Sequence, residues 1–195
     1  MEEHKPDKAI GNIVYHRQQS HRIAALADGI FAIIMTLLVL DIRVPVTATW
    51  HSDYGALLAL KEVLPKILAY FLSFTVAGLF WSVYVNQYNY IKAPDRNLNM
   101  ISLFFFMFCA LMPFTTSFLA EDIHSHVACA LYALNIFIFS TFLRLHWLYA
   151  SKNGLTYSDD VPIETINKLF RRRAIFSEVC YAASVGLSFL SSDVT

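Results

Sequence analysis

The chain has 195 residues and a formal net charge of zero; 56% of its residues are hydrophobic and only 15% are charged. Soluble domains carry about 25% charged residues, so this composition excludes an ordinary soluble domain and indicates an integral membrane protein. A balanced charge also gives no reason to expect nucleic-acid binding. The three cysteines lie far apart inside apolar segments, which favours small buried hydrophobes over a disulfide framework or a metal site.

Residues 1–21 are polar and lack the apolar core and small-residue cleavage site of a signal peptide. We therefore predict a cytoplasmic N-terminal tail over 1–21 and a transmembrane domain over 22–195. The first span is predicted at 23–42, because the apolar run there has about the 20 residues that cross a bilayer as one helix. Asp28 lies inside this run, where a bare carboxylate costs about 2.5–3.5 kcal/mol. Asp28 therefore needs a partner, either Arg22 or a neighbouring helix.

Three more spans are predicted, at about 64–84, 98–119 and 127–149. Pro65 is expected in the first turn of the second span, and Pro113 is expected to kink the third. An interfacial helix is predicted at 162–173 and a short, weak fifth span at 174–190. The fold class is therefore an all-α polytopic membrane bundle of five to six transmembrane helices. The weak final span suggests that a sixth helix is absent from this chain; the alternative is that the fifth helix does not span.

Lys and Arg residues gather in the N-terminal tail and in the loops on one side of the predicted membrane. The positive-inside bias therefore predicts a cytoplasmic N-terminus. Acidic residues on the other side are interpreted as solvated loop charges, the alternative being that they concentrate cations there; they are Asp41, Asp53, Glu62, Glu121 and Asp122.

Helical spacing places Ile33, Leu37 and Leu40 on one stripe of the first span, with Thr36 beside it. Any spanning helix has such a stripe, so its plain interpretation is contact with lipid or with the protein core. The alternative is a hydrophobic constriction that gates a pore by dewetting. Asp28 also has two interpretations: a structural polar network that fixes helix packing, or part of an ion or proton pathway.

The first span resembles the first-helix signature of the transmembrane protein 175 family, the endosomal and lysosomal potassium channels and their prokaryotic relatives. The resemblance is carried by Arg22-Ile-Ala-Ala-Leu26-Ala27-Asp28-Gly29 and by Thr36-Leu-Leu-Val-Leu40-Asp41-Ile42. Gly78-Leu-Phe80-Trp81 and Leu111-Met-Pro113-Phe-Thr115 resemble the second and third helices. Two departures stand out. The family's Phe-Ser-Asp is here Leu26-Ala27-Asp28, and Tyr84 stands where the family often has His.

The resemblance implies a potassium-selective, leak-like cation channel that assembles as a homotetramer, with a pore lined by the first helix of each subunit. The sequence contains no TVGYG-type filter loop. Ile33 matches the family's constriction residue, Leu37 and Leu40 would form further rings, and Thr36 would place four hydroxyls near the pore. Arg22, Asp28 and Trp81 would form the remaining structural polar network.

The expected partners are K+ ions, the lipid bilayer of the cell membrane and three further copies of the chain. No cofactor or bound metal is expected apart from the permeant K+. A proton pathway or secondary transporter centred on Asp28 is the first alternative function, and a non-conducting membrane scaffold is the second. An enzyme is not expected, because the sequence shows no nucleophile with its base and no nucleotide-binding loop.

Overall fold

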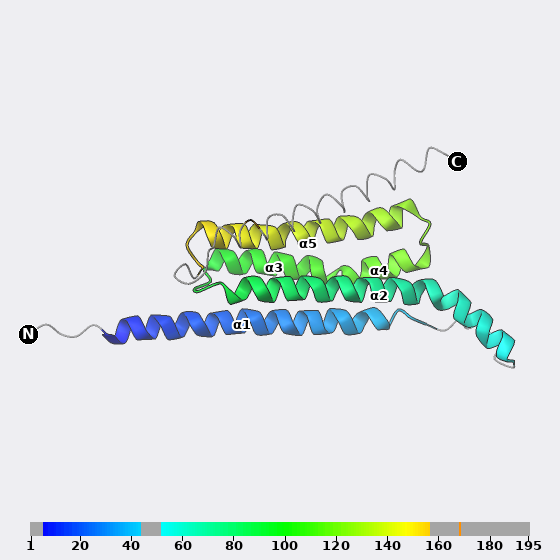
Figure 1. Cartoon of the computed structure of the whole chain (residues 1–195), viewed down its shortest axis with the longest axis horizontal. Coiled ribbons are helices and arrows are strands. Elements are labelled where there is room, and N and C mark those ends of the chain that lie inside the picture. Colours follow the sequence, from blue (N-terminus) through cyan, green and yellow to red (C-terminus); the bar gives the residue numbers. More distant parts are fainter. Residues whose placement is uncertain (1–5, 44–51, 157–167, 169–195) are drawn as a thin grey trace, which may run out of the picture.

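A computed structural model describes residues 6–43, 52–156 and 168 of the chain. The described part is an all-α bundle with α1 (Pro6–Val39) along one edge and α5 (His126–Lys152) along the other (Figure 1). Between these two edges lie α2 (Asp53–Asn89), α3 (Arg96–Ala110) and α4 (Met112–Glu121). Helix α1 therefore packs against α2, α3 and α4 and leaves its outer side uncovered.

Four stretches of the described chain are long and apolar enough to cross a membrane: Arg22–Val39, Asp53–Asn89, Arg96–Glu121 and His126–Lys152. They correspond to the first four predicted spans and confirm the all-α class. The predicted interfacial helix and the fifth span lie outside the described residues. The total of five to six spans therefore stays a prediction.

Helices α1 and α2 both begin earlier than predicted. Helix α1 begins at Pro6, so most of the polar segment predicted as a tail continues the first span as helix. Helix α2 begins at Asp53 because the Ser52 side chain caps it, accepting a hydrogen bond from the amide of Gly55 at 3.2 Å. Pro65 therefore lies inside α2 and not in its first turn, and the first turns of α2 project past the bundle at an angle (Figure 1).

The third span is interrupted near Pro113, as its sequence predicted. Helix α3 ends at Ala110 and α4 begins at Met112, with the proline in the first turn of α4. Proline has no amide proton, so the helical hydrogen bond to the carbonyl of Cys109 cannot form. Beyond the break, the Thr115 hydroxyl donates to the carbonyl of Met112 at 3.1 Å. The Thr116 hydroxyl lies 2.8 Å from the same oxygen and shares its single proton between that carbonyl and the hydroxyl of Ser73.

The interior of the bundle combines a chain of hydroxyl groups with an aromatic cluster. Thr116 of α4 donates to Ser73 of α2 at 2.8 Å, and the Ser73 hydroxyl lies 3.1 Å from that of Tyr132 on α5. Toward the other end of the span, Tyr84 stacks on Phe105. These contacts join the helices that lie behind α1 and give it a fixed surface to pack on.

Candidate functional site

One face of helix α1 packs into the hydrophobic core of the subunit. Ala27, Phe31, Ile34 and Leu38 recur at helical spacing, and none of them is more than 2% exposed. Three of them, Ala27, Phe31 and Ile34, belong to the main hydrophobic core. At about 25 cal/mol per Å² of buried apolar surface, such side chains hold α1 on the bundle by several kcal/mol in total.

The opposite face of α1 is left uncovered by the residues that the structure describes, and it carries all four predicted pore residues. Ile33 is 58% exposed, Leu37 43% and Leu40 63%, and Thr36 is also exposed. The Thr36 hydroxyl lies 2.9 Å from the carbonyl oxygens of both Ala32 and Ile33, so its proton is directed into its own helix. Its oxygen lone pairs are thereby left to face outward.

Small residues lie beside this apolar stripe. Ala25, Gly29 and Ala32 are exposed, and a side chain added at Gly29 would meet no atom within 4 Å. On this part of the uncovered face the side chains project little from the helix, so another helix can approach the backbone of α1 closely. No described residue of the same subunit occupies that space.

The structure brings together two of the three residues predicted for the polar network. Trp81 of α2 donates its indole N–H to Asp28 of α1 at 2.8 Å. Arg22 is exposed and does not pair with Asp28 among the described residues. The separation of six residues along a helix, more than one and a half turns, accounts for this, because it places the two side chains on different faces.

The two departures from the family signature both face the subunit interior. Ala27, where the signature has Ser, is fully buried in the hydrophobic core. Tyr84, where a His is often found, is 1% exposed and donates its hydroxyl to Ser102 of α3 at 3.3 Å. Tyr84 therefore serves the packing of α2 on α3, and its hydrogen bond does not involve Asp28.

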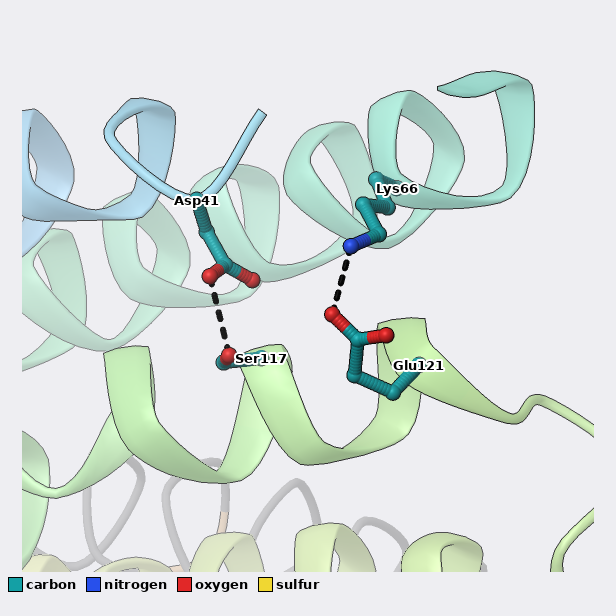
Figure 2. A network of polar contacts seen from close by, with 4 residues as sticks. All are labelled: Asp41, Lys66, Ser117 and Glu121. Carbon is teal, nitrogen blue, oxygen red and sulfur yellow. Dashed lines mark hydrogen bonds and ion pairs between the residues drawn. The ribbon is translucent and has the colours of Figure 1, made fainter. Parts of the chain in front are cut away.

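A further polar cluster lies at the C-terminal end of α1, and residue spacing does not predict its contacts (Figure 2). Ser117 of α4 donates to the Asp41 carboxylate at 2.9 Å. Lys66 of α2 pairs with Glu121 at the end of α4, 2.5 Å from nitrogen to oxygen. Asp41 and Glu121 thus have specific partners, which the interpretation as solvated loop charges did not include, although Glu121 stays solvated with 66% of its side chain exposed. Asp41 and Ser117 are 76 positions apart, beyond the reach of any spacing rule.

No group of three or more His, Cys, Asp or Glu side chains in the described ranges is placed to hold a metal ion. The site offers apolar side chains, hydroxyls and isolated carboxylates, and no described cluster in which a bound cation would be fully coordinated. Such a surface suits contact with a membrane, another helix or a passing ion.

Four membrane-capable helices in an all-α bundle define a multi-pass membrane protein. The family model for the endosomal/lysosomal potassium channel TMEM175 matches residues 22–113. A potassium channel of Streptomyces collinus is 32% identical over 91% of this chain and 86% of that protein. The chain belongs to the TMEM175 family, which is a family of ion channels and not of enzymes.

Two further relatives extend the comparison. The crystal structure of a lysosomal potassium-selective channel TMEM175 homolog from Chamaesiphon minutus superposes with a TM-score of 0.73 at 25% identity, and covers 91% of this chain and 92% of that one. An endosomal/lysosomal proton channel TMEM175 of Gallus gallus is 35% identical over 54% of this chain, but over only 23% of its own length. The potassium channel relatives therefore match the chain over most of its length, whereas the avian one matches it in part.

Proposed function

We propose that the chain is one subunit of a potassium-selective, leak-like cation channel in which α1 from each of four copies lines a central pore. The observation that carries this proposal is the division of α1 into a buried face and an apolar face that none of the described residues of the subunit covers. Helix α1 also lies at the edge of the bundle, where copies of the chain can meet around an axis (Figure 1). The names of the bacterial relatives support K+ as the permeant ion.

In this channel Ile33 forms the narrowest ring, and Leu37 and Leu40 form two further rings toward the C-terminal end of α1. K+ holds its hydration shell less tightly than Na+, so K+ loses part of that shell more cheaply at an apolar ring. The Thr36 hydroxyl oxygens lie beside the rings and offer lone pairs to a partly dehydrated ion. Selectivity that comes from dehydration alone is modest, in contrast to that of a carbonyl-lined filter.

The proposal includes an orientation and a set of partners. Residues 22–195 form the transmembrane channel domain of a protein in the cell membrane, and the segment 1–21 is cytoplasmic, as the distribution of Lys and Arg favours. The partners are K+ ions, the bilayer and three further copies of the chain. No resident cofactor takes part, because ion passage through apolar rings needs none.

The test is K+ flux through the purified protein in liposomes, with Na+-only and proton controls, for the wild type and Ile33→Asn. The variant should wet the ring and lower the preference for K+ over Na+. Leu134→Asn is the matched control, because Leu134 is 48% exposed on α5, at the edge of the bundle away from α1. Unaltered selectivity in Ile33→Asn would remove Ile33 from the pore.

A proton pathway centred on Asp28 is the second candidate. Two observations favour it: Asp28 is the acid inside the first span, and the vertebrate relatives carry the name proton channel. This function predicts saturable, pH-coupled flux that Asp28→Asn abolishes. The channel function instead predicts ohmic K+ current that persists in Asp28→Asn, so one pair of flux measurements separates the two.

A further inference from the structure

Asp41 is a carboxylate at the unfavourable end of a helix. Helix α1 ends at Val39 and has no basic residue in its last turn. The negative end of the helix dipole repels an anion placed there, so Asp41 weakens α1 in isolation. The backbone continues in tight turns, with the amides of Leu40, Ile42 and Arg43 each bonded two or three residues back. What compensates Asp41 is a tertiary contact, the Ser117 hydroxyl of α4.

Helix α4 is a firm support for that contact, because it is tied to two other helices. Thr116, the neighbour of Ser117, donates to Ser73 of α2 at 2.8 Å. Asn135 of α5 donates to Thr115 at 3.4 Å. All four of these side chains are buried, so their hydrogen bonds are shielded from competing water. Ser117 is therefore presented to α1 from an anchored surface (Figure 2).

We propose that the Asp41–Ser117 hydrogen bond is a positioning contact that holds the end of α1 on α4 and thereby sets where Leu37 and Leu40 stand in the pore. This inference rests on the proposed function, because it assumes that α1 lines the pore. Leu40 precedes Asp41 directly and Leu37 lies one turn before it, so a movement of Asp41 carries both leucines with it. A bond that fixes Asp41 therefore fixes the width of two of the three apolar rings.

The rival role for Asp41 is that its charge concentrates cations at the mouth of the pore. Ser117→Ala separates the two roles, because it removes the hydrogen bond and leaves the charge. Asp41→Asn does the reverse: it removes the charge and keeps an oxygen that can accept from Ser117. If Asp41 positions the end of α1, Ser117→Ala should change the K+/Na+ selectivity. If the charge of Asp41 concentrates cations, Asp41→Asn should lower the conductance at low salt.

The experiment measures reversal potentials in K+/Na+ gradients for the full chain in planar bilayers. In Ser117→Ala the K+/Na+ permeability ratio should change by at least about twofold and at most about tenfold, the range that corresponds to one ordinary, part-buried hydrogen bond. Ser117→Thr keeps the hydroxyl and should restore the ratio. Ser151→Ala is the matched control, because among the described residues the Ser151 hydroxyl bonds to a carbonyl of its own helix, that of Leu148, and to no other helix.

Hydrogen–deuterium exchange of the segment 37–43 gives a second readout that needs no current. The amides of Leu40 and Ile42 should exchange faster in Ser117→Ala and return to the wild-type rate in Ser117→Thr. Unchanged exchange would overturn the positioning contact, and so would an unchanged permeability ratio in a conducting Ser117→Ala. If Lys66→Gln, which loosens α4 from α2, shifts the ratio equally, the effect belongs to α4 docking and the proposal is wrong.

These outcomes are distinct from failure of the proposed function. A wild type that passes no K+, or an Ile33→Asn variant with unaltered selectivity, contradicts the pore itself. The exchange experiment still decides in that case whether Ser117 holds the end of α1.

Discussion

Trp81 on α2 holds the carboxylate of Asp28 on α1 at 2.8 Å, across the interface between the first two spans. An indole N–H can only donate and a carboxylate can only accept, so the two groups are matched. Together with the Ser117 contact to Asp41, this bond pins α1 near both ends of its apolar segment. Asp28 inside the first span and Asp41 just beyond its end thereby both act as attachment points between helices.

Replacement of Trp81 by Phe should destabilise the protein by about 1–2 kcal/mol, because it leaves Asp28 without its donor. The value stays low because both side chains are partly exposed within the subunit. Thermal unfolding in detergent measures the change. Asp28→Asn is the matched variant and should cost less, since an amide oxygen still accepts from the indole. An unchanged melting temperature in Trp81→Phe would show that this bond contributes nothing to stability.

The two faces of α1 should respond differently to truncation. Phe31→Ala removes a ring that is 2% exposed and should destabilise the subunit by about 3–5 kcal/mol. Ile33→Ala, two residues away and 58% exposed, should cost less than about 1 kcal/mol in the isolated subunit and should act on ion flux. Unfolding in detergent and liposome flux, measured on the same two variants, check this. Equal losses of stability would contradict the division into faces.

Loss of a hydroxyl in the buried chain should be costly where the hydroxyl links helices. Thr116→Val keeps the shape of the side chain but removes the donor to Ser73, and should destabilise by about 1–3 kcal/mol. Thr141→Val is the control, because the half-buried Thr141 hydroxyl bonds, within the described part of the chain, to a carbonyl of its own helix, that of Phe137, and to no other helix. The difference between their unfolding midpoints isolates the contact between helices, and a difference of zero would refute its contribution.

Tyr84 should matter for its ring more than for its hydroxyl. Tyr84→Phe loses one long hydrogen bond of 3.3 Å and should cost about 1 kcal/mol or less. Tyr84→Ala removes a fully buried ring that stacks on Phe105 and Tyr88, and should cost about 3–5 kcal/mol. The unfolding free energies of the two variants, each compared with that of the wild type, measure the contribution of the ring against that of the hydroxyl. A larger loss in Tyr84→Phe than in Tyr84→Ala would reverse this assignment.

Local features of the sequence carry much of this fold. Hydropathy located all four described spans, and Pro113 located the break in the third, because a missing amide proton acts within one turn. The stripe of Ile33, Leu37 and Leu40 followed from helical period, and the structure places these residues on one exposed face. That they line a pore remains a prediction.

Contacts between distant residues were beyond the sequence. Asp28 was expected to need a partner, and its spacing from Arg22 disfavours a pair within α1. Trp81 was named only through the family resemblance, because the contact depends on how α2 crosses α1. The bond of Ser117 to Asp41 depends in the same way on how α4 is placed after the break. The start of α2 was predicted too late because proline favours the first turn of a helix, whereas α2 begins after the cap at Ser52 and contains Pro65 in its interior. For Asp28 and Asp41, tertiary packing decided among alternatives that local chemistry left open.

Phe31 and Ile33 are two residues apart and lie on opposite sides of α1. A single substitution there therefore changes either the packing inside the subunit or the outer surface of α1, and not both. The side that holds Phe31 accepts only side chains of nearly the same volume, because the space around it is filled. The side that holds Ile33 can exchange its side chains without any rearrangement inside the subunit. Substitutions that accumulate on the Ile33 side of α1 can therefore change the outer surface of this helix while the fold of the chain stays the same.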